Sequence, residues 1–238
     1  MTATATALRD FYEAPGTTVS SGPDRARRQA RMLADVLAGR DGQQRIVDVG
    51  CGEGTATHLV KRLDPANTVI GVDWSAMALA QARARGVLVV QGGIDGLPLP
   101  DTSVDVVIMS ELIEHLVDTD AAAEEARRVL RPGGTLLLST PNLAAWYNRG
   151  LIGLGIQPVF SEVSLKGIYG RPGQEVVGHL RLFTRRALEE FLTARGFACE
   201  RICGAPYHDV PRPLRPLDRW LCHWPSAASI LLVQARRV

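Results

Sequence analysis

Five short apolar runs, separated by segments of helical pattern, constrain the fold of this chain more than any other feature. They are rich in β-branched residues and occupy positions 46–49, 69–72, 87–90, 104–109 and 135–138. Apolar residues fill these runs almost continuously, which is typical of strands covered by helices on both faces. Strands that alternate with helices predict a parallel sheet. We therefore expect an α/β fold with a doubly wound sheet.

The flanking segments extend this pattern to seven strands. A helix is predicted over residues 24–37, within an N-terminal helical segment at 1–40. A second is predicted from Thr184 to Arg195 and ends at Gly196, and strands are predicted at 197–203 and 230–235. The length of 238 residues suits a single domain spanning 1–238.

The strand and helix alternation breaks after the fifth predicted strand. Residues 142–178 are too many for an ordinary connection, so we expect an insertion that acts as a lid over a substrate. Trp146, Tyr147 and Tyr169 give this segment the aromatic content of a wall for a flat or apolar molecule, and Tyr12 could fold over the same site. The alternative is that the aromatic residues only pack the insertion onto the sheet and that Tyr12 belongs to a frayed end.

Composition argues against several classes of partner. The net charge is +2, and the cluster Arg25, Arg27, Arg28 and Arg31 is predicted to be a solvated helix face, so we expect no nucleic acid partner. No stretch approaches 18 apolar residues without charges, so we expect no membrane span. The sequence leaves the oligomeric state open.

The cysteines and the C-terminal histidines indicate no metal site. Cys51, Cys199, Cys203 and Cys222 lack paired spacing, which fits a protein of the reducing cytoplasm. His208 and His223 lie where four prolines, at 206, 211, 213 and 216, predict irregular structure. We therefore expect no metal ligands among these residues.

A glycine loop follows the first predicted strand. Its sequence is Asp48-Val49-Gly50-Cys51-Gly52-Glu53-Gly54-Thr55, and a helix is predicted from about residue 56. Glycine lets the backbone turn tightly and approach a ligand, and a helix N-terminus favours negative charge. Asp73 ends the second strand, where a carboxylate can bind both ribose hydroxyls. These features predict a nucleoside ligand.

The spacing of the glycines separates two classes of nucleotide enzyme. A dinucleotide fingerprint has the order G-x-G-x-x-G, but here the third glycine comes one position early, at Gly54, and Thr55 follows it. An NAD(P)-dependent oxidoreductase is therefore a weaker alternative, and a nucleoside-binding module without catalysis is another.

From this loop onward the sequence resembles the class I S-adenosylmethionine-dependent methyltransferases. Ordered segments similar to that family continue to about residue 200: Leu97-Pro98-Leu99-Pro100-Asp101, Val104-Asp105-Val106-Val107, Glu111-Leu112-Ile113-Glu114-His115-Leu116, Arg128-Val129-Leu130-Arg131-Pro132-Gly133-Gly134 and His179-Leu180-Arg181-Leu182-Phe183-Thr184. The resemblance implies a Rossmann-like fold and S-adenosyl-L-methionine as the cofactor, with S-adenosyl-L-homocysteine as the product.

The resemblance also assigns cofactor-binding residues. Asp48 would hold the methionine amino group, and Asp73 would hold the ribose hydroxyls with Trp74 beside the adenine. Ser110 would face the methionine end. The family usually carries an acidic residue where this chain has Gly93, so either Asp95 replaces it or Ile94 and backbone groups bind the adenine. The loop residues that would line the cofactor are Gly50, Cys51, Gly52 and Thr55.

Two histidines are candidates for acid–base chemistry. His179 follows the insertion, so it is a candidate general base or else an anchor for the lid. His115 lies four residues after Glu111 on a predicted helix, and packing beside the cofactor is the preferred interpretation for that pair. We expect methyl transfer to an oxygen, nitrogen or nucleophilic carbon of a small molecule, in a biosynthetic pathway of specialised metabolism.

Overall fold

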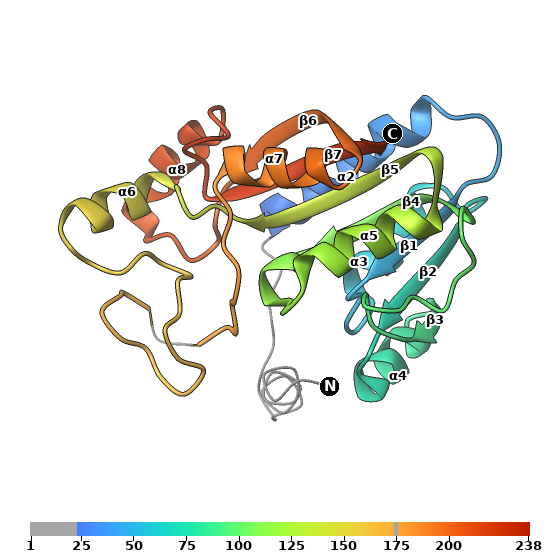
Figure 1. Cartoon of the computed structure of the whole chain (residues 1–238), viewed down its shortest axis with the longest axis horizontal. Coiled ribbons are helices and arrows are strands. Elements are labelled where there is room, and N and C mark those ends of the chain that lie inside the picture. The colour runs from blue at the N-terminus through green and yellow to red at the C-terminus, as the bar shows by residue number, and fades with distance from the viewer. Residues whose placement is uncertain (1–22, 174–175) are drawn as a thin grey trace.

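The computed structural model describes residues 23–173 and 176–238 (Figure 1). Tyr12 lies outside these residues. In chain order the elements are α2 (Pro23–Ala38), β1 (Arg45–Val49), α3 (Thr55–Leu63), β2 (Thr68–Asp73), α4 (Ala76–Ala84), β3 (Leu88–Gln91), β4 (Val104–Ser110), η1 (Ile113–His115), α5 (Thr119–Val129), β5 (Leu130–Pro141), α6 (Trp146–Gly153), α7 (Arg185–Ala194), β6 (Phe197–Ala205), η2 (Arg212–Leu214), α8 (Arg215–Leu221) and β7 (Ile230–Arg237).

Within the described residues the strands form a seven-stranded sheet in the order β3-β2-β1-β4-β5-β7-β6. β1 pairs in parallel with both β2 and β4, and β3 and β5 continue the parallel arrangement outward. β7 pairs antiparallel with β5 and β6. The predicted α/β class with a doubly wound, mostly parallel sheet is confirmed.

Successive residues of the central strands pack into different halves of the core. Ile46 lies in the cluster formed with Met32 and Leu33 of α2, whereas Val47 lies in the cluster formed with Ala126 of α5 and Leu188 of α7. Each strand is therefore covered on both faces, which is why the sequence shows continuous apolar runs. Figure 1 shows α2 on one face of the sheet with α5 and α7 on the other.

Two local predictions are wrong. α8 forms in the segment where prolines predicted irregular structure, because Pro216 occupies the first turn, where the missing N–H has no helical partner to lose. The segment after β4 is only the short η1, and Glu111 precedes it with a left-handed φ of 52°. Glu111 and His115 therefore do not share the face of a regular helix.

The solvated interpretation of the arginine cluster fails at Arg25, which is only 4% exposed. Its guanidinium donates a hydrogen bond of 3.0 Å to Ser139 Oγ on β5. Since α2 lies across the sheet, the first turn of this helix carries Arg25 beneath the strand ends. In the described part of the chain, no helix combines the length and the hydropathy needed to cross a membrane.

Candidate functional site

The strand order reverses between β1 and β4, so the connections after these adjacent strands leave in opposite directions. In open α/β sheets this switch point, at the carboxyl ends of the strands, is where ligands bind. The glycine loop follows β1 at this edge, Asp73 ends β2, and Glu111 follows β4. The fold thus brings together three segments that the sequence singled out separately.

The glycine loop has a conformation that requires glycine. Gly50, Gly52 and Gly54 all have positive φ, at 72°, 52° and 76°. A Cβ on Gly54 would lie 2.7 Å from Ala82 Cβ of α4, so this glycine permits close packing of the start of α3. A Cβ on Gly52 would meet nothing within 4 Å among the described residues. The loop therefore turns its middle glycine toward open space.

Asp73 connects the end of β2 to the glycine loop. Its Oδ2 accepts a hydrogen bond of 2.8 Å from the Gly52 N–H, and its Oδ1 accepts one of 2.9 Å from the Ser75 N–H. Each carboxylate oxygen has a further lone pair, so both can also accept from ligand hydroxyls. Trp74 follows directly and is partly buried, with its carbonyl held by the Gln91 side chain at 3.0 Å.

Asp48 lies buried beneath the loop and is 3% exposed. The hydroxyl of Thr57 on α3 donates to its Oδ2 at 2.6 Å. Burial raises the pKa of Asp48 to about 6 from the ordinary 3.8, although Thr57 and the positive charge of Arg25 both oppose the rise. A buried carboxylate of this kind is poised to receive a cationic group.

The remaining residues predicted to bind the cofactor lie in the glycine loop, at the end of β4 and at the start of α3. Cys51 is half-buried against Gly71, where a Cβ would come within 2.7 Å of its sulfur, and burial raises the pKa of its thiol. Ser110 at the end of β4 accepts a hydrogen bond of 2.6 Å from Gln29 of α2. Thr55 is the exposed first residue of α3.

Asp95 bends back over the position where the family usually carries an acidic side chain. A Cβ on Gly93 would lie 2.4 Å from Asp95 Oδ1, so the carboxylate occupies the space that a side chain at 93 would take. Ile94 between them is buried. The Asp95 carboxylate thus stands in the place of a side chain at position 93.

The segment after β4 is tied to β5 and to the chain that returns from the insertion. The Glu111 N–H donates to both the carbonyl and the hydroxyl of Ser139. The carbonyl of Glu114 accepts from Leu180 N–H at 2.7 Å and from Arg181 N–H at 3.0 Å. These bonds place His179 directly beside η1.

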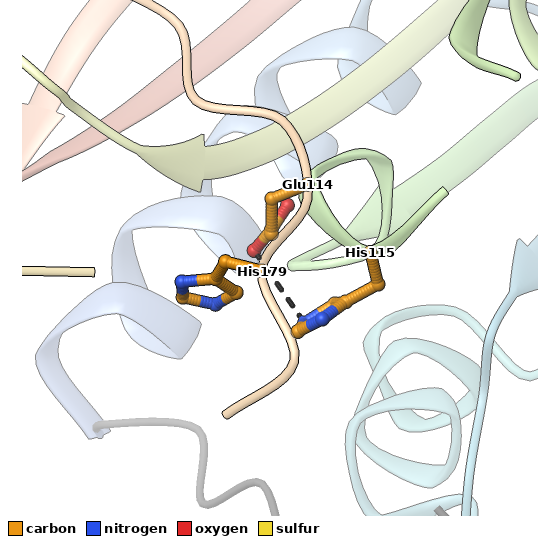
Figure 2. Close-up of side chains that lie close together, drawn as sticks. All are labelled: Glu114, His115 and His179. Carbon is orange, nitrogen blue, oxygen red and sulfur yellow. Dashed lines mark ion pairs between the residues drawn. The ribbon is translucent and has the colours of Figure 1, made fainter. Parts of the chain in front are cut away.

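Glu114, His115 and His179 form one cluster (Figure 2). The His115 and His179 ring centroids lie 4.7 Å apart, and His115 Nε2 lies 4.0 Å from Glu114 Oε1. Burial lowers the pKa of His115 to about 4 and that of His179 to about 3. Burial and the neighbouring Glu111 raise the pKa of Glu114. Both imidazoles are therefore neutral and weakly basic near neutral pH.

Glu162 organises the insertion. Its carboxylate accepts hydrogen bonds from the backbone N–H groups of Val177, Gly178 and His179 at 2.7–3.1 Å. It also forms an ion pair of 2.9 Å with Arg171, in which both side chains are at most 5% exposed. The segment that leads back to the sheet is thus fixed from within the insertion.

Of the three aromatic residues predicted to form a wall, Trp146 and Tyr147 pack against each other, whereas Tyr169 is exposed. Trp146 donates its indole N–H to Asp218 of α8 at 2.9 Å. The Tyr147 ring packs edge-on against the Trp146 ring. Burial also raises the pKa of Tyr147. Tyr169 is 60% exposed. Figure 1 shows α6 and α8 close together.

Four residues that shape the site had no motif to reveal them: Arg25, Thr57, Glu162 and Asp218. Arg25 and Asp218 contact residues that are distant in sequence, whereas Thr57 and Glu162 each lie nine positions from a partner, Asp48 and Arg171 respectively. A threonine on the inner face of the helix after a glycine loop is a usable signal, because its hydroxyl can reach the preceding strand.

Comparisons with known proteins indicate the type of domain that carries these residues. The profile of a family described as a methyltransferase domain matches residues 47–138. A probable S-adenosylmethionine-dependent methyltransferase of Mycolicibacterium smegmatis is 46% identical over 112 residues, which are 46% of this chain and 41% of that protein. Over this region the chain is similar to the S-adenosylmethionine-dependent methyltransferases. The predicted resemblance to that family is thereby confirmed.

Two further proteins illustrate the extent of the similarity to the methyltransferases. A demethylmenaquinone methyltransferase of Mycolicibacterium paratuberculosis is 35% identical over 136 residues, which are 56% of this chain and 57% of that protein. A solved S-adenosylmethionine-dependent methyltransferase from Methanosarcina mazei superposes with a TM-score of 0.62 at 18% identity, over 86% of this chain and 97% of that one. The matched sequence thus spans less than two thirds of each curated relative, and the structural likeness shows the fold.

The methyltransferase cofactor, S-adenosylmethionine, fits the residues at this edge. A buried carboxylate at Asp48 suits the methionine ammonium group. The second carboxylate, Asp73, retains lone pairs for the ribose hydroxyls. The open space beside Gly52 leaves the loop free to approach the ligand.

Proposed function

We propose that this methyltransferase transfers the methyl group of S-adenosylmethionine to an oxygen, nitrogen or nucleophilic carbon of a small molecule. The observation that carries the proposal is the position of Asp48 and Asp73 on either side of the glycine loop at the switch point. The insertion at 142–178 leaves the sheet after β5, at the same edge. Cofactor and acceptor sites thus share one end of the sheet.

The residues of the chain act mainly by positioning. Bound S-adenosylmethionine supplies a methyl group on a sulfonium, which an acceptor displaces in line. Asp48 would hold the ammonium group, Asp73 the ribose, and the insertion would exclude water and orient the acceptor. His179 is a weak base at neutral pH because it is buried, so we propose that alignment contributes more than proton abstraction.

An apolar ring compound with a hydroxyl group is the acceptor class we propose. The matched relative from Mycolicibacterium paratuberculosis is named for a quinone-type compound. Phe160 and Tyr207 pack edge-on at 4.8 Å beside His179, which supplies an aromatic surface next to the cluster after β4. A biosynthetic role in specialised metabolism remains part of this proposal.

Calorimetry with S-adenosylhomocysteine tests the cofactor half, and product release from a panel of quinols and phenols tests the acceptor half. We expect cofactor binding that weakens by at least tenfold in Asp73→Ala and is unchanged in the matched surface variant Asp64→Ala. Binding of NADH without binding of S-adenosylhomocysteine would contradict the proposal and favour an oxidoreductase. Cofactor binding without turnover of any acceptor would favour a nucleoside-binding module.

A further inference from the structure

We infer that Glu114, His115 and His179 form a binding site for a divalent transition metal ion. Each residue offers one ligand atom, and these atoms lie within 4.8 Å of one another. Glu114 and His179 are buried, and His115 is 9% exposed. Figure 2 shows the carboxylate and both rings gathered in one place, two from η1 and one from the returning segment.

Each of the two rings is oriented by a backbone carbonyl at its Nδ1. His115 Nδ1 lies 3.2 Å from the carbonyl of Gly178, and His179 Nδ1 lies 3.3 Å from the carbonyl of Phe160. A carbonyl only accepts, so Nδ1 carries the proton in each ring and Nε2 carries the lone pair. Metal-binding histidines are usually oriented by this kind of bond from the other ring nitrogen.

The two oxygens of the Glu114 carboxylate differ in their surroundings, and only one of them accepts a hydrogen bond from the described residues. Glu114 Oε2 accepts a hydrogen bond of 3.0 Å from Thr140 on β5. Its Oε1 is fully buried and has no hydrogen-bond partner among the described residues. Leaving a buried carboxyl oxygen without a partner is costly, and a bound cation would compensate that cost. Oε1 is also the oxygen that faces His115 Nε2.

A second carboxylate strengthens the case for a cation. Glu111 also has a buried Oε1 without a hydrogen-bond partner in the described chain. Its backbone is held in a left-handed conformation, at a φ of 52°, by its bonds to Ser139. Non-glycine residues in this conformation are uncommon and cluster at functional sites. Glu111 thus adds a second buried carboxyl oxygen without a hydrogen-bond partner in the described chain, close enough to Glu114 for its charge to act there.

The ligand set favours zinc or a similar ion. Imidazole nitrogen suits zinc, cobalt(II), nickel(II) and iron(II), whereas magnesium and calcium prefer oxygen alone. Ligands about 2.1 Å from a tetrahedral zinc lie about 3.4 Å apart, so the side chains need to close by roughly 1 Å. Three protein ligands leave a coordination position open for water or substrate.

The open coordination position of the metal would bind the methyl acceptor, and this part of the inference rests on the proposed function. Leu112, next to η1, lies against the glycine loop, since a Cβ on Gly50 would come 3.0 Å from its side chain. The metal would therefore lie beside the methyl donor. An acceptor oxygen bound to it would be fixed and made more acidic.

Metal binding is tested on the untagged full chain after treatment with a chelator. We expect it to bind one equivalent of Zn²⁺ by calorimetry, and one equivalent of Co²⁺ with the visible absorption of a site of low coordination number. Failure of the folded wild-type chain to bind either ion would overturn the inference. This readout needs neither cofactor nor turnover, so the metal site and the proposed function can fail separately.

Variants then locate the ion. Glu114→Gln and His179→Gln should each weaken Zn²⁺ binding by at least about 100-fold and change the cobalt spectrum, because each removes a ligand. His208→Gln, outside the cluster, should leave both unchanged. Circular dichroism checks folding, and His115→Gln provides a third ligand test if one variant unfolds. Equal binding in the ligand variants, or equal loss in His208→Gln, would show an adventitious ion and refute the site.

Discussion

Replacing Asp48 by asparagine should make the protein more stable at neutral pH. Because burial raises the pKa of this carboxyl from 3.8 to about 6, ionising it in the folded state costs about 3 kcal/mol, at about 1.4 kcal/mol for each pH unit. The asparagine oxygen can still accept from Thr57, whereas its amide N–H groups need new partners. We therefore expect a net gain of about 1–2 kcal/mol at pH 8.

The raised pKa of Asp48 determines how the stability difference between the wild type and Asp48→Asn changes with pH. The folded-state pKa of Asp48 lies above the unfolded value, so its contribution to stability is most favourable below pH 4 and is lost as the pH rises through about 6. The stability of the wild type relative to Asp48→Asn should thus fall by about 2–3 kcal/mol between pH 4 and pH 8.

Urea unfolding of both proteins at several pH values measures this difference. Asp105→Asn is the matched control, because Asp105 is also buried but pairs with Arg131 at 2.9 Å, and losing that pair should destabilise the protein. If Asp48→Asn proves less stable than the wild type at pH 8, the buried carboxylate is compensated in the folded state and the reasoning about its pKa is refuted.

Three further changes probe the cofactor site and the insertion. Asp73→Ala should weaken S-adenosylmethionine binding by about 10–100-fold, or 1.4–3 kcal/mol, by calorimetry, because the ribose and the Gly52 N–H both lose their acceptor; unchanged affinity would contradict the ribose assignment. Gly52→Val should abolish that binding, since a β-branched residue is strained at a φ of 52° and fills the open space; normal binding would show that the loop does not contact the ligand. Glu162→Ala should lower stability by about 3–5 kcal/mol in denaturant unfolding, because the backbone N–H groups of residues 177–179 and the Arg171 guanidinium all lose a buried acceptor; replacing the exposed Glu190 by alanine should cost little, and an equal loss in both would refute this account of the insertion.

The strands were predictable because their signal is local. β1 and β4 are buried on both faces, so apolar residues occupy consecutive positions, and the predicted ranges fall within one residue of the structure at most of these ends. The glycine loop was equally readable, since Gly52 and Gly54 require backbone conformations that few other residues adopt. In both cases the physical constraint acts on neighbouring residues of the sequence.

The other half of the site depends on contacts between distant segments. His179 reaches Glu114 only because the backbone of 180 and 181 bonds to the Glu114 carbonyl, and no spacing in the sequence indicates this. The burial of Arg25 has no signal in the sequence, because Arg27 and Arg31 on the same helix do reach solvent. Burial of a single polar residue on an amphipathic helix is decided by what lies opposite, which is β5 here.

The antiparallel strand β7 has a consequence for the order of folding. The base of the insertion rests on the connection that precedes β7, since Asn142 donates to the Ala228 carbonyl at 2.8 Å and Trp146 N–H donates to Ala227. The glycine loop and the strands around it, by contrast, are formed from residues 45–110 alone. During synthesis the glycine loop and its neighbouring strands can therefore assemble first, whereas the segment after β5, which we propose covers the acceptor, completes only when β7 inserts between β5 and β6.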